Sequence, residues 1–367
     1  MKKKQNKKPA ISDIAKKIPS TQQLKQLASK SDTTKSTPQT VPRITNESIA
    51  EHREAVLGRA RKYIYPLKHS RHRIVKISVA IFVIALVAFF VGTTLALYKF
   101  QNTSSFTYAV TKIIPFPVAK VNHSYVSYED YLFELRHYMH YYESQQGSNF
   151  ATTDGQRQLD RFKHSSLEAA VNHAYVKQLA KQHGVSVSSA EVDQQIALVR
   201  AQNRLGSSDR VFRSVLREFW GWSVRDFKRE LRSELLEQKV IAKLDTSTNA
   251  EAQEVLAKLK AGGDFEALAA QYSDDTATKD KGGAYGFVID QNSRDVSPQA
   301  VEALYGLQKT GDITDVINSG YYLEIDKLLG EKDGKLRAAH ITFNFKDVNV
   351  YLRPAKQQHP ATYYLHL

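Results

Sequence analysis

The chain has 367 residues, which leave room for two or three modest domains, and it contains no cysteine, so disulfides, thiolate catalysis and cysteine-based zinc sites are excluded. Its formal net charge of +14 resides in residues 1–76, which hold 19 Lys and Arg against 5 Asp and Glu, whereas the remaining 291 residues hold 33 of each sign. The basic excess therefore belongs to one tail, and no nucleic-acid partner is expected from the charge of the rest.

Residues 1–76 are rich in Lys, Gln, Ser, Thr and Pro and carry only short apolar patches. A segment of this composition buries too little apolar surface to fold, which predicts a disordered, basic, cytoplasmic tail. A tail that binds RNA or a protein partner is the alternative. It is disfavoured because no aromatic residues are interleaved with the basic run.

Residues 77–98 are expected to be a transmembrane signal anchor. The run Ile77–Leu97 is uncharged, and at 1.5 Å per residue its length matches a hydrocarbon core of about 30 Å. Many more basic residues precede this run than follow it. The positive-inside rule therefore predicts a single-pass protein of the cell membrane, with the N-terminus cytoplasmic and the later domains extracytoplasmic.

Residues 99–117 read as a linker, and residues 118–245 show three- and four-residue apolar spacing throughout. Gly184 and Gly206 fall where two of the expected helices end. We therefore predict an all-α domain over residues 118–245.

Glu134, His137 and His140 recur at three-residue spacing in this region and could share one helix face as metal ligands. Solvated histidines on an aromatic-rich helix are the favoured interpretation, so no metal is expected. Trp220 and Trp222 flank Gly221 and predict packing at a helix turn rather than a ligand site.

Residues 246–345 change in character, because helical patterns come first and strand patterns follow, which predicts a small α+β domain with an antiparallel sheet. Asp264 and Ser297 are expected helix N-caps. Strands are expected in YGFVI, ITDVINS, YYLEIDKLL and, across the turn EKDG, KLRAAHITF. Residues 346–367 form no recognisable unit and are expected to be a C-terminal tail.

The run GGDFEALAAQYSDDTATKDKGGAYGF, which begins at Gly262, resembles the central motif of the parvulin-type (PpiC rotamase) peptidyl-prolyl isomerases. The resemblance continues through LQKTGDIT and SGYYLEI. The helical region is similar, less sharply, to the N-terminal chaperone domain of SurA-, PrsA- and PpiD-type foldases, in VAKVNHSYVSYEDYLFEL and LAKQHGVSVSSAEVDQQI. Together these resemblances imply a membrane-anchored foldase without a cofactor, whose partners are unfolded or translocated polypeptides containing X-Pro bonds.

Parvulins normally begin with a strand of the form Val-Arg-Ala-x-His-Ile-Leu, but here the matching run, KLRAAHITF, comes last. In the family fold the last strand lies antiparallel beside the first. The resemblance therefore implies a circularly permuted parvulin, in which the missing first strand and its histidine, His340, are supplied from the C-terminal side.

The same resemblance implies the site residues. Asp275 corresponds to the family's residue near the substrate carbonyl, Ser319 to a Ser or Thr before the last strand, and Tyr322 to the second histidine. With His340 these would be the catalytic residues. On the substrate side the resemblance implies Tyr285, Phe287, Val296 and Val301.

The family's Met and Phe of the proline pocket have no match in this chain. A peptide-binding chaperone without turnover, or a surface scaffold with a degenerate rotamase fold, therefore stays an alternative to the isomerase.

Overall fold

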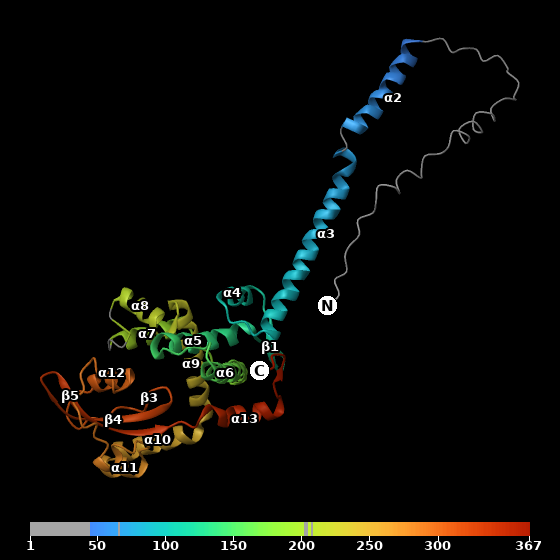
Figure 1. The fold of residues 1–367 in the computed structure, drawn as a ribbon. Coiled ribbons are helices and arrows are strands. Elements are labelled where there is room, and N and C mark those ends of the chain that lie inside the picture. The colour runs from blue at the N-terminus through green and yellow to red at the C-terminus, as the bar shows by residue number, and fades with distance from the viewer. Residues whose placement is uncertain (1–44, 65–66, 202–204, 207) are drawn as a thin grey trace. The chain divides into compact units, whose positions relative to one another are not determined.

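The computed structural model describes residues 45–64, 67–201, 205–206 and 208–367, so most of the predicted tail lies outside the described residues. The chain divides into two compact units, residues 1–85 and 86–367 (Figure 1). Each unit is described by itself.

The first unit is helical where it is described. Helix α2 spans Asn46–Ile64, and α3 begins at Leu67 and ends at Thr94, in the second unit. The prediction of a tail without structure is therefore wrong for α2, whose sequence is dominated by strong helix formers. Its start is capped reciprocally, because the Thr45 amide donates to Ser48 Oγ and the Ser48 amide donates to Thr45 Oγ1.

Within the described part of the chain, one helical segment is long and apolar enough to cross a membrane. It spans Arg73–Lys99 and has a mean hydropathy of 2.9 over its most apolar window, none of which is buried inside the structure. It comprises most of α3 and the π-helical turn η3, Leu95–Lys99.

The second unit contains two lobes. The helical lobe comprises α4 (Ser105–Ile113), β1 (Pro117–Val121), β2 (Ser124–Ser127), α5 (Tyr128–Gln146), α6 (Thr153–Gln182), α7 (Ser189–Ala201), α8 (Asp209–Trp220) and α9 (Val224–Leu244). Its core lies between β1, α5 and α6, where Tyr128, Tyr131 and Tyr175 are almost fully buried. Helix α9 joins the lobes, because Val240 packs in this core and its neighbour Ile241 packs in the core of the second lobe.

The helical lobe is not all-α as predicted, and the expected C-terminal tail is part of it. Strand β1 pairs on one side with β2 and on the other with β6, Thr362–Tyr363, at the end of the chain. Helix α13, Val348–Gln358, buries Leu352 completely in the same core. The polar composition of residues 346–367 concealed this role, because only a few of their side chains are buried.

The sheet lobe comprises α10 (Thr246–Lys260), α11 (Phe265–Tyr272), the 3-10 turn η4 (Lys279–Lys281), α12 (Pro298–Gly306), β3 (Ile317–Asn318), β4 (Tyr322–Lys332) and β5 (Lys335–Asn344). The sheet is antiparallel throughout, in the order β3-β4-β5. Helices α10 and α11 cover one face, over Ile325 and Ile341, and α12 covers part of the other face, over Leu328 and Leu336 (Figure 1).

The predicted hairpin between YYLEIDKLL and KLRAAHITF is confirmed. Strands β4 and β5 pair from Tyr322–Asn344 to Lys332–Lys335, with one bulge near Gly330. The connecting residues Asp333 and Gly334 both have positive φ, as a tight two-residue hairpin turn requires. The predicted strand over YGFVI is instead an irregular segment, held to β5 by isolated bridges at Ala284 and Ile289.

Substitution of Leu352 tests whether the C-terminal segment belongs to the helical lobe. Because its side chain is fully buried, Leu352→Ala should lower the free energy of unfolding by about 2–5 kcal/mol. Urea denaturation of the full chain in detergent, followed by circular dichroism, measures the change. The matched control is Val350→Ala on the same helix, where the side chain is 47% exposed and a change within about 0.5 kcal/mol is expected. Equal effects of the two substitutions would contradict the packing of α13.

Candidate active site

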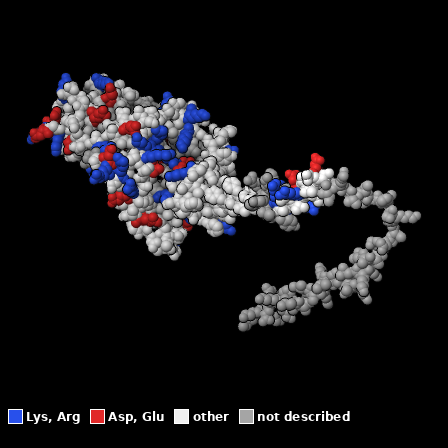
Figure 2. Space-filling model, turned by 90° about the horizontal axis from the view of Figure 1, so that it is seen from above, with Lys and Arg blue, Asp and Glu red and all other residues white. Residues whose placement is uncertain are grey.

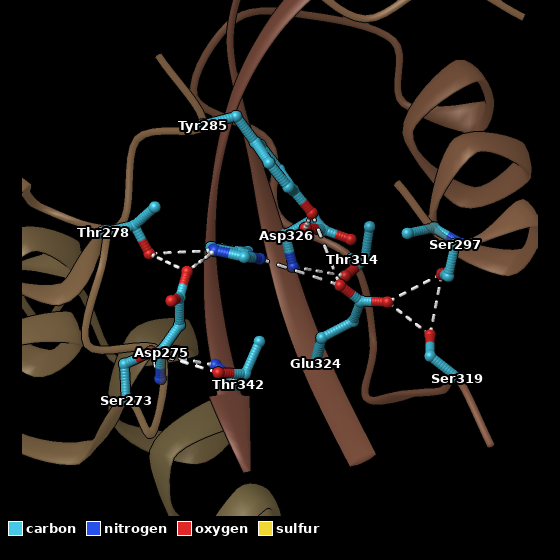
Figure 3. Close-up of polar contacts among 12 residues, drawn as sticks. Ser273, Asp275, Thr278, Tyr285, Ser297, Thr314, Ser319, Glu324, Asp326 and Thr342 are labelled. Carbon is cyan, nitrogen blue, oxygen red and sulfur yellow. Dashed lines mark hydrogen bonds and ion pairs between the residues drawn. The ribbon is translucent and has the colours of Figure 1, made fainter. Parts of the chain in front are cut away.

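The polar face of the hairpin β4–β5 carries a cluster of hydrogen-bonded side chains (Figure 3). It draws on segments that lie far apart in the sequence: the loop after α11, the segment before α12, and both strands. The alternation of a strand places His340 of β5 and both Glu324 and Asp326 of β4 on this face. Asp326 and His340 are direct cross-strand neighbours.

His340 is held by Asp275 and Thr278. Its Nε2 lies 2.9 Å from Asp275 Oδ2 and 2.9 Å from Thr278 Oγ1. Thr278 uses its own hydroxyl proton to donate to Asp275, so Nε2 is the donor to both oxygens. Partial burial alone would raise the pKa of Asp275, but hydrogen bonds from Thr278, the Ala277 amide and His340 bring that pKa below its ordinary value. Asp275 is therefore an ionised acceptor that fixes the tautomer of His340.

The backbone around this pair is joined tightly to β5. The Asp274 amide donates to the Thr342 carbonyl, and the Thr342 amide donates to Ser273 Oγ. The His340 amide donates to the Gly283 carbonyl. Gly283 has φ +76°, and a Cβ there would lie 2.2 Å from the His340 carbonyl oxygen. Only glycine lets the loop approach the strand this closely.

Glu324 is the centre of a second set of contacts on the same face. Its carboxylate accepts hydrogen bonds from Ser297 Oγ, at 2.8 Å, and from Ser319 Oγ. Its other oxygen lies 3.4 Å from Tyr285 Oη and 3.9 Å from His340 Nδ1. Glu324 is 1% exposed, so these hydroxyl groups supply the hydrogen bonds that water would otherwise make to its carboxyl group.

The side chain of Asp326 has fewer hydrogen-bond partners than that of Glu324. It is fully buried, Oδ1 accepts from Tyr285 Oη at 2.9 Å, and Oδ2 has no hydrogen-bond partner among the described residues. Burial, followed by the negative charge of Glu324, raises the pKa of Asp326 well above its ordinary value. Of the two carboxyl groups, Asp326 is therefore the one that keeps its proton.

The structure brings most of the predicted site residues together. His340, Asp275, Ser319 and Tyr285 all belong to the cluster, and the rings of Tyr285 and His340 are 4.2 Å apart. Phe287 lies 5.7 Å from the Tyr285 ring and is 42% exposed. These two rings form an aromatic surface beside His340.

Two predicted residues lie in an apolar core next to the cluster, against which Tyr285 packs. Val296 and Val301 are buried in the core under α12 rather than beside His340. Tyr322 lies on β4 opposite Asn344, two pairs beyond Glu324 and Thr342 and on the same face, where its hydroxyl group forms hydrogen bonds with Ser297 and Ser319. Burial, followed by the charges of Glu324 and Asp326, raises the pKa of Tyr322 to about 12. The carboxylate of Glu324, rather than Tyr322, faces the imidazole of His340.

Sequence reasoning missed Thr278, Ser297, Glu324 and Asp326 as site residues. The strand alternation of YYLEIDKLL was the available signal, because it places Glu324 and Asp326 on one face and leaves Leu323 and Ile325 for the core. No sequence signal marks Thr278, which lies within a polar loop.

Two groups of side chains have the composition of metal ligands. The donor atoms of Glu324, Asp326 and His340 lie within 4.8 Å of one another, as do those of Glu134, His173 and Glu230 in the helical lobe. The trio Glu134, His137 and His140 considered from spacing does not converge. The ring of His137 stacks on Trp222 at 4.5 Å, and His140 Nε2 lies 2.9 Å from the Glu218 carbonyl oxygen.

The cluster has the elements that rotation of an amide requires. A twisted amide loses conjugation between its carbonyl and its nitrogen, and fixed hydrogen-bonding groups stabilise it without forming a covalent bond. The protein supplies a fixed imidazole, a carboxylate and hydroxyl groups next to an exposed aromatic surface. Rotation about an amide bond requires no nucleophile.

Comparison with known proteins matches each lobe to a family. Residues 67–241 match the SurA-like N-terminal domain, and residues 235–329 match the PPIC-type PPIase domain. The chain is thus similar to a SurA-like N-terminal domain followed by a PPIC-type PPIase domain. The second match ends before β5, so the strand that carries His340 lies beyond it.

Several curated proteins are similar to both regions. YacD of Bacillus subtilis (strain 168), whose name describes a peptidyl-prolyl cis-trans isomerase, is 30% identical over 39% of this chain and 55% of its own length. Foldase protein PrsA of Pediococcus pentosaceus is 28% identical over 49% of this chain and 70% of its own. Foldase protein PrsA 2 of Bacillus anthracis is 29% identical over 51% of this chain and 68% of its own length. The chain thus spans little more than half of the first of these relatives.

The raised pKa of Asp326 in the sheet lobe makes the free energy of unfolding depend on pH. The folded state keeps a proton on Asp326 that the unfolded chain loses above a pKa of about 4, so the free energy of unfolding falls as pH rises through the folded pKa. Asp326→Asn cannot titrate, and its stability relative to wild type should therefore increase with pH. Urea denaturation at several values between about pH 5 and about pH 9 measures this.

Asp333→Asn, in the exposed turn of the same hairpin, serves as the control and should shift stability by the same amount at every pH. A difference between wild type and Asp326→Asn that does not vary with pH would show that Asp326 is ionised in the folded state.

Proposed function

We propose that this protein is a membrane-tethered peptidyl-prolyl cis-trans isomerase and foldase that acts on unfolded, translocated polypeptides. The observation that carries the proposal is the ionised Asp275 bound to His340 beside the aromatic surface of Tyr285 and Phe287. The match of residues 235–329 to the PPIC-type PPIase domain supports it independently.

In the proposed reaction the substrate proline packs on the exposed ring of Phe287, with its carbonyl close to His340. The uncatalysed barrier to rotation is about 18–20 kcal/mol. Because Asp275 and Thr278 fix the imidazole before substrate binds, little reorganisation is needed when the amide twists. Glu324 and its hydroxyl donors hold the other side of the imidazole.

We also propose that the domain is a circularly permuted parvulin. In this interpretation β5 takes the place of the family's first strand, although it follows β4 in the chain. Three observations support it: β5 pairs antiparallel with β4, His340 faces Asp275, and the match to the PPIC-type domain ends before β5.

The membrane arrangement is part of the same proposal. Residues 77–98 would cross the bilayer once, with the N-terminus cytoplasmic and the rest of the chain extracytoplasmic. The length and hydropathy of Arg73–Lys99 support a membrane span, and the basic residues before it support the orientation. In this proposal the helical lobe, which includes α4, α13 and β6, is the chaperone domain. The sheet lobe is the isomerase domain, where clients with X-Pro bonds would bind.

Substitution of His340 tests catalysis. His340→Ala removes the fixed imidazole and should lower kcat/KM by tenfold or more, on the order of the loss expected when one preorganised donor is deleted. A protease-coupled assay on a short X-Pro peptide, with the full chain in detergent, measures the rate. His359→Ala, an exposed histidine outside the sheet lobe, is the matched control and should keep the wild-type rate.

Two results would refute the isomerase. One is a wild-type rate no higher than background, and the other is a rate that His340→Ala leaves unchanged. Suppression of the aggregation of a proline-free unfolded client, in the absence of isomerisation, would then favour the peptide-binding chaperone.

A further inference from the structure

A cleft of about 630 Å³ opens in the helical lobe between β2, α5, α6 and α9. We refer to it as the basic cleft. Its charged walls contain six Lys and Arg side chains: Lys177, Lys181, Arg225, Lys228, Arg229 and Arg232. Basic side chains also gather toward the middle of the face drawn in Figure 2, with acidic ones between and around them.

Five of the six cations form two rows. Lys177 and Lys181 are four residues apart on α6, and Arg225, Arg229 and Arg232 follow at four- and three-residue spacing on α9. Residues at such spacing share one face of a helix, so each row runs along one wall of the cleft. Cations four residues apart are separated by about 6 Å along the helix axis, and Arg229 and Arg232 by about 4.5 Å.

The side chains of three of these cations are not held by an ion pair or a hydrogen bond in the part of the chain that the structure describes. Arg229 is bound to Glu129 and Asp130 at 2.7 and 2.6 Å, and Lys228 is bound to Asp193 at 2.6 Å. Lys177, Lys181 and Arg225, by contrast, form no ion pair or hydrogen bond with any described residue. An unpaired positive charge is left on both walls.

The acidic groups on the floor of the cleft do not cancel this charge. Burial, followed by the charge of Glu230, raises the pKa of Glu134 to about 8, and burial also raises the pKa of Glu230. The pKa of His173 is lowered by burial, so this ring is neutral. Glu134 therefore carries little negative charge near neutral pH, and Asp130, whose pKa is lowered, is already bound to Arg229.

The rim and walls of the basic cleft also offer contacts to uncharged side chains of a bound peptide. Tyr125 of β2 is 65% exposed at the cleft, and Lys120 Nζ lies 5.4 Å from its ring centroid. Ala174 and Leu236 add apolar surface to the walls. In a bound peptide, the side chains that neighbour an acidic residue could thus pack on this aromatic and apolar surface.

We propose that the basic cleft binds extended polypeptide segments that carry Asp or Glu at every second position. Alternate side chains on an extended chain lie on one side and are about 6.6 Å apart, close to the spacing of cations that are four residues apart in each row. The inference rests on the proposed foldase function, since it assigns a charge preference to the clients. Selection of acidic clients takes place at the basic cleft and isomerisation at His340.

The test uses the full chain in nanodiscs of zwitterionic phosphatidylcholine. The probes are a fluorescein-labelled peptide of alternating Glu and Thr and its counterpart of alternating Lys and Thr, and anisotropy gives the affinity. The Glu peptide should bind at least about tenfold more tightly at low salt, and added salt should reduce this preference.

Charge reversal locates the binding site. The Lys177→Glu/Lys181→Glu variant should lose about tenfold in affinity for the Glu peptide and gain affinity for the Lys peptide, which a merely misfolded variant would not do. The control, Arg161→Glu/Arg210→Glu, changes the same net charge at exposed positions outside the cleft and should bind as wild type.

The proposal is overturned if both peptides bind alike or if the control loses as much as the cleft variant. It is also overturned if only vesicles containing phosphatidylglycerol bind through Lys177 and Lys181, because the cleft would then contact lipid. Isomerisation of an uncharged X-Pro peptide, measured on the same samples, separates the two proposals: its absence refutes the isomerase and leaves a preference for the Glu peptide standing.

Discussion

The antiparallel pairing of β4 with β5 is the constraint on which the sheet lobe depends. Its register places Asp326 beside His340 on one face and Ile325 beside Ile341 on the other, so one set of hydrogen bonds fixes both the polar cluster and the apolar core. A shift of one residue would exchange the two faces and bury the wrong side chains. The buried isoleucines therefore stabilise the geometry that holds His340 against Asp275.

The same hairpin directs the chain back to the helical lobe. After β5, helix α13 buries Leu352 in the first core, and β6 pairs with β1. With α9, whose Val240 and Ile241 pack in different cores, this return joins the lobes at both ends of the sheet domain. The proposed isomerase site around His340 and the basic cleft thus belong to one compact unit.

Much of this arrangement follows from the sequence. Helix caps at Asp264 and Ser297 and the Asp-Gly turn are local signals, and all three are found in the structure. Local signals failed where long-range contacts decide, as with β6, whose two residues become a strand only because β1 offers an edge. They also did not show that Val296 and Val301 pack with Leu328 and Leu336 in one apolar core beside the polar cluster.

A double-mutant cycle between His340 and Asp275 tests the central claim most directly, since the two residues meet only through the fold. Effects on kcat/KM are compared for His340→Ala, Asp275→Ala and the double variant. If the pair acts as a unit, the double variant should be no slower than the slower single variant, with a coupling energy above about 1 kcal/mol. Losses that simply multiply would show that the two side chains act independently and would contradict the proposed site.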